Sequence, residues 1–291
     1  MSLSEATVDR ALEKLELAGR PEPTLKGLST VYSAWCRHVP FDNVRKLIHV
    51  RRADPGVLPG DDAGDFFDHW LRFGAGGTCW AGNGALCELL GSLGFSAARA
   101  VGTMLVAPNL PPNHGSAMVL FDGRRYLVDA SILHEEPLLL EAPLRLEASL
   151  RLAAPASLDE RAPAAAALPA WSAAGSFRDG HWYIRWRPVH KLQGIDCRID
   201  HFDADVATFR RQHEQTRGWS PFNYGLHARM IRGTSVIGTA FGQRVEFNAL
   251  GEVAERPLPA SDRVRFLVEE MGIHEELAAM VPKELPIPLP T

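Results

Sequence analysis

The stretch HGSAMVLFDGRRYLVDAS, residues 114–131, decides how the central part of the chain folds. Two runs typical of strands flank Asp122-Gly123, and Asp-Gly between such runs is a strong signal for a β-hairpin. Side chains of a strand alternate between the two faces of a sheet, so residues on paired strands that share a face lie close together. The hairpin therefore predicts which polar side chains of this stretch meet.

The register of this hairpin follows from the length of its turn. A two-residue loop pairs Phe121 with Arg124, and counting outward makes His114 and Asp129 diagonal neighbours on one face. A four-residue loop preserves this parity, whereas a three-residue loop would separate the two side chains. An imidazole beside a carboxylate is two thirds of a Cys-His-Asp triad, because the imidazole takes a thiol proton and the carboxylate fixes its tautomer.

A candidate for the missing thiol lies in GAGGTCWAGNGALCELLG, residues 74–91. Cys79 precedes a run that predicts a helix over 79–93, and a helix N-terminus favours a thiolate and offers free N–H groups to an oxyanion. Gly76 and Gly77 would allow a substrate to approach closely. An isolated cysteine before an apolar helix is also typical of a small core residue, and a lone histidine or aspartate at a strand end is typical of a turn.

The first part of the chain, up to about residue 95, is predicted to be mostly helical. A loop is expected over 38–62, because proline at position 40 ends a helix. The expected helices are residues 4–19, a second segment that Thr24 caps and that ends before Pro40, residues 64–72, and residues 79–93 with Gly94 as the C-cap.

The later part of the chain changes to short strands. Residues 141–176 are rich in Ala, Pro and Leu, which favours either looping connections or a mobile segment. The expected elements are strands in ARAVGTMLVA, SAMVLF, RRYLVDA and HWYIRWRP, a short helix near 203–214, strands in NYGLHARMIRG, TSVIGTAFG and QRVEFNAL, and a final helix over 260–280.

Composition excludes several classes of function. The 291 residues carry a net charge of −4 with no basic cluster, which argues against binding of nucleic acid. No apolar run is long enough to span a membrane, and the start of the chain lacks the pattern of a signal peptide, so we expect a cytoplasmic protein. The four cysteines form no CxxC pair and the eleven histidines form no HExxH motif, so neither a disulfide nor a metal is expected.

Together these features resemble the arylamine N-acetyltransferase family. Its signature of Arg-Gly-Gly, one residue, Cys, an aromatic residue, Glu, one residue and Asn is similar to the sequence AGGTCWAGN at 75–83. VPFDNV resembles the Pro-Phe-Glu-Asn stretch of the family, and His114 and the Asp129 of YLVD follow in the family order. SPF at 220–222 and LVEEMGIHEEL near the C-terminus extend the resemblance along the whole chain.

The resemblance implies an α+β fold in three parts around a cysteine-proteinase-like core. Residues 1–95 are expected to form a helical bundle that carries the nucleophile, residues 96–200 a central antiparallel β-barrel, and residues 201–291 an α/β lid. The implied catalytic triad is Cys79, His114 and Asp129, with the last two on the barrel.

The resemblance also implies an enzyme that transfers acyl groups by a ping-pong mechanism. Cys79 would take an acetyl group from acetyl-coenzyme A as co-substrate and pass it to an arylamine or arylhydrazine, with His114 as base and acid. Phe41 and Phe222 match positions that line the substrate pocket, the alternative being that both are core residues. Ser131 lies in the segment that replaces a glycine-rich, cofactor-binding loop of the family.

Departures from the family pattern leave the acyl donor open. Ala75 and Ala81 replace the Arg and Glu of the signature, and the bulkier segment 130–133 replaces the glycine-rich loop. One alternative is an amide synthase that takes a long acyl chain from an acyl carrier protein and passes it to an aryl amine. Others are a transglutaminase-like thiol hydrolase and a binding module without activity. The expected partners are a small aryl amine and an acyl thioester, with no nucleic acid and no membrane.

Overall fold

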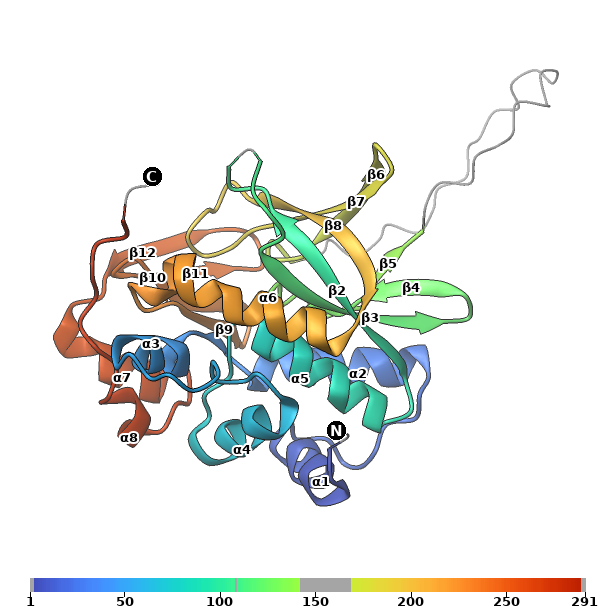
Figure 1. Cartoon of the computed structure of the whole chain (residues 1–291), viewed down its shortest axis with the longest axis horizontal. Coiled ribbons are helices and arrows are strands. Elements are labelled where there is room, and N and C mark those ends of the chain that lie inside the picture. Colours follow the sequence, from blue (N-terminus) through green and yellow to red (C-terminus); the bar gives the residue numbers. More distant parts are fainter. Residues whose placement is uncertain (1–2, 108, 142–168, 289–291) are drawn as a thin grey trace.

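The computed structural model describes residues 3–107, 109–141 and 169–288. Along the chain, a group of helices is followed by a seven-stranded sheet and then by a five-stranded sheet with helices packed beside it (Figure 1). Most of the alanine- and proline-rich stretch over 141–176 lies outside the described residues. The order of helices, strands and mixed elements agrees with the α+β prediction.

The N-terminal part contains five helices and one short strand. Thr24 caps the second helix by accepting a hydrogen bond from the N–H of Gly27, as expected, and Gly94 has a φ of 87° just after the fifth. The elements are α1 (Glu5–Lys14), α2 (Leu25–His38), β1 (Phe41–Asp42), α3 (Val44–Arg51), α4 (Ala63–Phe73) and α5 (Cys79–Ser92).

Helix α3 corrects the prediction of a loop over 38–62. Val44, Leu47 and Ile48 lie at helical spacing and are buried. Val44 and Ile48 pack into a cluster whose other members come mainly from beyond residue 225, so the apolar face has its partner at the far end of the chain. The pattern was too short and too charged to identify a helix without that partner.

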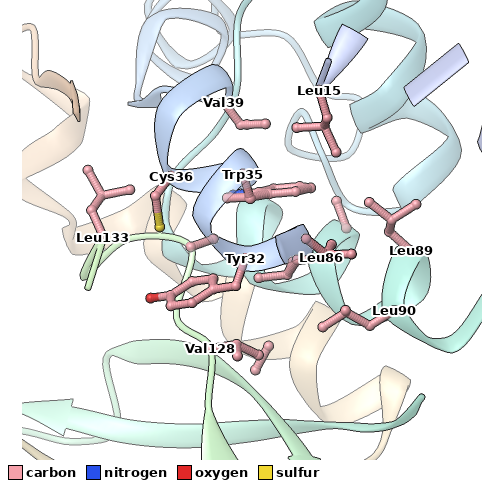
Figure 2. Packing of buried hydrophobic residues seen from close by; sticks show 14 of the residues in the cluster. Leu15, Tyr32, Trp35, Cys36, Val39, Leu86, Leu89, Leu90, Val128 and Leu133 are labelled. Atoms are coloured by element: carbon pink, nitrogen blue, oxygen red, sulfur yellow. The ribbon is translucent and has the colours of Figure 1, made fainter. Parts of the chain in front are cut away.

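The helices pack around α2 and α5, which form the main core. Tyr32 and Trp35 of α2 face Leu86 and Leu89 of α5, and Val128 from the segment after the hairpin reaches the same cluster (Figure 2). The Trp35 ring also stacks on Phe66 of α4, with centroids 5.7 Å apart. Burial of these large rings joins the helices to one another and to the sheet beyond them.

The seven-stranded sheet is antiparallel and nearly closes into a barrel. Its order is β5-β4-β3-β2-β8-β7-β6, and its two edge strands contact each other: a Cβ on Gly175 would lie only 3.3 Å from Leu140. The strands are β2 (Ser96–Met104), β3 (His114–Phe121), β4 (Arg124–Leu127), β5 (Leu138–Leu140), β6 (Ala174–Arg178), β7 (His181–Trp186) and β8 (Ile195–Ala204).

The β3–β4 hairpin has the predicted turn and register. Phe121 pairs with Arg124, so the loop consists of two residues. Asp122 and Gly123 both have positive φ, 48° and 74°, as a type I′ turn requires. The prediction of a two-residue loop is therefore confirmed.

The second sheet joins the two ends of the chain. Its order is β1-β9-β10-β11-β12, so the short strand of the N-terminal part is paired with the C-terminal strands. The elements of this part are α6 (Val206–Trp219), the short 3-10 helix η1 (Pro221–Asn223), β9 (Ala228–Arg232), β10 (Ser235–Ala240), β11 (Gln243–Asn248), β12 (Val253–Pro257), η2 (Ala260–Asp262), α7 (Arg263–Glu269) and α8 (Glu275–Ala278).

Two expected elements of this part differ in extent. The single helix predicted over 260–280 is broken at Gly272, which has a φ of 71° and separates α7 from α8. The helix predicted near 203–214 starts later, because strand β8 continues to Ala204 and Asp205 caps α6. The predicted boundaries at 95 and 200 remain predictions, with β8 crossing the second of them.

The hairpin turn offers a test of the register. We expect Gly123→Val to lower the free energy of unfolding by about 1–2 kcal/mol, because a side chain at positive φ meets the backbone. Gly218→Ala on α6, where a Cβ would meet nothing within 4 Å, should not lower it. Denaturant unfolding of the two variants measures both effects, and equal losses would contradict the role of the turn.

Candidate active site

The structure brings His114 and Asp129 together in a buried hydrogen bond. His114 begins β3 and Asp129 follows β4, and His114 Nε2 lies 2.7 Å from Asp129 Oδ2. Their exposed fractions are 2% and 1%. The diagonal contact that the hairpin register predicted is therefore present.

The other oxygen of Asp129 is held by four donors. Oδ1 accepts hydrogen bonds from the N–H of Ser131 at 2.8 Å, its hydroxyl at 2.7 Å, the N–H of Ile132 at 3.1 Å and Asn83 Nδ2 at 3.1 Å. Burial alone would raise the pKa of Asp129, but the charge of His114 and the hydrogen bonds from the side chains of His114 and Ser131 hold that pKa well below its usual range. The carboxylate is therefore ionised and fixed in direction.

Asn83 ties helix α5 to this carboxylate. Its Nδ2 also donates to the carbonyl of Gly115 at 2.7 Å, and its Oδ1 accepts from the N–H of Ala130 at 2.8 Å. Asn83 is fully buried, so each of these groups lacks water as an alternative partner. Asn83 is the last residue of the family signature, and the sequence alone predicted no role for it.

Cys79 is the first residue of α5 and lies beside the histidine. The preceding Thr78 makes no side-chain hydrogen bond to the helix, so its hydroxyl does not occupy the N–H groups of the first turn. Burial would lower the pKa of His114, but the Asp129 charge, the Asp129 hydrogen bond and a hydrogen bond with the Cys79 side chain raise it to about 10. The three residues named from the sequence are thus neighbours.

The two phenylalanines predicted to bind substrate also lie at this place. Phe41 belongs to a buried cluster with Cys79, and Phe222 packs against that cluster. The two rings meet edge to face with centroids 5.6 Å apart. They lie beside the thiol, and their role in substrate binding stays a prediction.

Ser131 and the segment around it face inward. The Ser131 hydroxyl donates to Asp129, and positions 130–133 are all buried. Its hydrogen bonds support the Asp129 carboxylate, and a role in cofactor binding stays a prediction.

Small side chains replace the charged residues of the signature. A Cβ added to Gly60 would lie only 2.4 Å from the Cβ of the buried Ala81, so the loop before α4 approaches α5 closely.

Asp42 accepts hydrogen bonds from the N–H of Val44 at 2.9 Å and of Gly76 at 2.7 Å, and burial raises its pKa to about 6. Backbone N–H groups thus supply the hydrogen bonds of the buried Asp42 carboxylate.

Two buried cations near Cys79 were not predicted from the sequence. Lys46 of α3 donates to Thr216 Oγ1 at 2.7 Å, and burial lowers its pKa to about 7. Arg229 of β9 donates to the carbonyl of Ser131, and burial lowers its pKa to about 9. Both cations lie close enough to Cys79 for an electrostatic interaction with it. The sequence did not indicate a role for either cation, because Lys46 lay in a predicted loop and Arg229 lay in a strand pattern with no distinguishing feature.

Two further observations concern the part of the chain that the structure describes. Over residues 3–107, 109–141 and 169–288, no three His, Cys, Asp or Glu side chains are grouped so that they could hold a metal ion. None of the helices in those ranges has the length and apolar character needed to cross a membrane.

Comparison with known proteins finds similarity to one family over part of the chain. A family model described as N-acetyltransferase matches residues 24–154. An arylamine N-acetyltransferase of Mycolicibacterium smegmatis is 32% identical over 125 residues, which are 40% of this chain and 43% of the relative. Each of these two matches covers less than half of this chain, so together they show a similarity to arylamine N-acetyltransferases over part of it. The Mycolicibacterium smegmatis relative is named as an enzyme, and the match spans less than half of its length.

Solved arylamine N-acetyltransferases share the fold over nearly the whole chain. The Salmonella typhimurium protein has a TM-score of 0.73 at 17% identity, covering 97% of this chain and 98% of that one. The Mycobacterium marinum protein in complex with CoA also has a TM-score of 0.73, at 19% identity with 95% of each chain covered. At this identity the likeness establishes the fold, including the mixed helix and sheet architecture with its nearly closed antiparallel barrel.

The bridge between helix α5 and the barrel can be tested by Asn83→Ala. We expect the free energy of unfolding to fall by about 2–4 kcal/mol, because the buried Gly115 carbonyl and Ala130 N–H lose their partner. Gln215→Ala on the exposed face of α6 removes an amide of similar size and should change it by less than about 0.5 kcal/mol. Urea titration measures both, and a neutral Asn83 variant would contradict the bridge.

The histidine and aspartate pair should make stability depend on pH. The pKa of His114 is raised from an ordinary 6.5 to about 10 in the folded protein, so the native state holds more protons between these values. This contribution is fully present below pH 6.5 and is lost as the pH rises through 10. We expect the stability difference between wild type and His114→Gln to shrink over that range in urea titrations. A constant difference would contradict the pairing.

Proposed function

We propose that this protein transfers an acyl group from a coenzyme A thioester through Cys79 to an arylamine-type nucleophile. The observation that carries the proposal is the buried hydrogen bond between His114 and Asp129 beside a cysteine at a helix N-terminus. The partial match to the N-acetyltransferase family model and the similarity to an arylamine N-acetyltransferase support it, and the Mycobacterium marinum structure in complex with CoA supports CoA thioesters as donors.

The first half-reaction acylates the cysteine. An ionised Asp129 accepts only, so the His114 nitrogen that faces it, Nε2, donates and Nδ1 is left as the base. With the pKa of His114 raised to about 10, Nδ1 already holds the proton of Cys79 at neutral pH. The Cys79 sulfur attacks the thioester carbonyl, and N–H groups of the first turn of α5 stabilise the oxyanion. The carbon–sulfur bond of the donor breaks, and the leaving coenzyme A thiolate takes the proton from His114.

The second half-reaction releases the acyl group. The amine attacks the acyl carbon of the thioester on Cys79 while His114 takes one proton from the amine nitrogen. The bond between Cys79 and the acyl carbon breaks, and His114 keeps the proton from the amine beside the released Cys79 sulfur, which restores the starting state. The buried aromatic cluster of Phe41 and Phe222 would receive an aryl group by stacking.

Acylation of Cys79 can be observed directly. Incubation with acetyl-coenzyme A should add about 42 Da, the mass of an acetyl group, to the intact protein, and Cys79→Ser should abolish the thioester adduct. His114→Gln should lower the rate of acylation by about 10²–10⁴-fold, because the thiol loses its base. Cys36→Ser is the matched control, since that thiol belongs to the main helical core rather than to the cluster that contains Cys79, and it should leave the adduct unchanged. A wild-type protein that takes no acyl group from any thioester would refute the proposal.

The acceptor distinguishes the transferase from its alternatives. An acyl-enzyme that persists in water and disappears when an aryl amine is added indicates transfer, whereas rapid loss without an amine indicates a thiol hydrolase. Labelling by a long-chain thioester in place of acetyl-coenzyme A would favour an amide synthase. That alternative and its acyl carrier protein remain predictions, because none of the relatives named above is described by either.

A further inference from the structure

Arg229 is a buried cation held among aromatic rings. Arg229 is 6% exposed, and it pairs with Phe41 across the β1–β9 ladder. The guanidinium carbon lies 4.8 Å from the centre of the Phe41 ring and 4.2 Å from the centre of the Trp186 ring. Stacking of this kind suits a weakly hydrated, planar guanidinium.

The charge of Arg229 has no carboxylate to balance it among the described residues. No described Asp or Glu oxygen lies within 4.0 Å of its guanidinium nitrogens. The nearby Asp129 is engaged by His114 and by its four other donors, and Asp42 by backbone N–H groups. A buried cation without a counter-ion is costly, so this charge indicates a negative group supplied from elsewhere.

Two buried donors are left unpaired at the same place. Arg229 uses Nη2 to reach the Ser131 carbonyl, but its Nε has no partner among the described residues. Trp186, on which the guanidinium stacks, has a buried indole Nε1 that also lacks one there. Both groups can only donate, and each unpaired buried donor costs about 1–3 kcal/mol. The missing partner is therefore an acceptor.

These donors adjoin the candidate active site. Ser131, whose carbonyl Arg229 binds, is the residue whose N–H and hydroxyl hold the triad carboxylate. Phe41, which lies under the guanidinium, packs in the cluster that contains Cys79. The guanidinium is thus connected to Cys79 through Phe41, and an acidic group on a ligand bound at the thiol would lie near Arg229.

We propose that Arg229 and the indole N–H of Trp186 form a subsite for a carboxylate carried by a substrate. The inference rests on the acyl transfer proposed above and names a substrate class for it. The guanidinium matches a carboxylate with parallel N–H donors, and the indole supplies a further one. The acid is carried either by the acyl group, as in a dicarboxylic thioester, or by the ring of the acceptor amine.

Matched pairs of substrates test the subsite and distinguish the two sources. Succinyl-coenzyme A is compared with butyryl-coenzyme A as donors, and 4-aminobenzoate with 4-aminobenzamide as acceptors. We expect wild type to favour the acid of one pair by about tenfold to a hundredfold in kcat/KM, the usual contribution of a charged hydrogen bond. Arg229→Gln should remove that preference, Trp186→Phe should reduce it, and Arg229→Lys should retain part of it.

Controls separate binding from structure. Arg232→Gln, on the exposed end of the same strand, should leave the preference unchanged. If Arg229 only supports the fold, Arg229→Gln will affect the acid and its neutral partner equally, and the inference is wrong. Trp186→Phe and Arg229→Lys give the same comparison if Arg229→Gln does not fold, which thermal unfolding will reveal.

Equilibrium binding keeps this test independent of turnover. Calorimetric titration of the protein with each acid and its neutral partner measures the preference even if no thioester acylates Cys79. Failure of acylation together with an Arg229-dependent preference for the acid would refute the proposed reaction and leave the subsite. Acylation with no preference for either acid, in kinetics and in titration, would refute the subsite and leave the reaction.

Discussion

The Asp129 carboxylate is the constraint on which the rest of the site depends. It joins three parts of the chain: the start of β3 through His114, helix α5 through Asn83, and its own loop through Ser131. The backbone carbonyl of Asp129 accepts a further hydrogen bond, at 2.8 Å, from the hydroxyl of Tyr32 on α2. A buried carboxylate with this many donors stays ionised, and its charge keeps the histidine beside Cys79 in one orientation.

Four ionisable side chains around the Cys79 thiol determine the charge balance there. The negative charge of Asp129 balances a protonated His114, so that a thiolate at Cys79 would remain as an extra negative charge. Arg229 and Lys46 lie where they act on that charge, although burial lowers the pKa of each. Two cations that are costly to bury become less so when the sulfur is ionised.

The sequence was most informative where the physical rule is local. The Asp122-Gly123 turn requires positive φ at two positions, and this requirement fixed the strand register and the contact of His114 with Asp129. The caps at Thr24 and Gly94 followed from the same kind of rule. The resemblance supplied Cys79 and the fold, which no single residue pattern indicated.

The sequence was least informative where an element depends on a distant partner. Helix α3 buries its apolar side against C-terminal residues, so its own pattern appeared to be that of a loop. Gly272 breaks the last helix because its close neighbour is the segment around Gly74, where a Cβ would lie 2.1 Å from the Gly272 carbonyl. A role for Arg229 can be inferred only from its contacts with Trp186 and Ser131, which strand pairing and tertiary packing bring beside it.

The pairing of β1 with β9 has a consequence for the order in which the protein matures. Phe41, which packs with the thiol, is held by a strand that leaves the ribosome near the end of synthesis. Such non-local pairing forms late, because its loop-closure entropy must be overcome first. A nascent chain that has completed its first five helices and its barrel therefore still lacks the strand that holds Phe41 beside Cys79, and this side of the candidate site forms only when the last third of the polypeptide has folded.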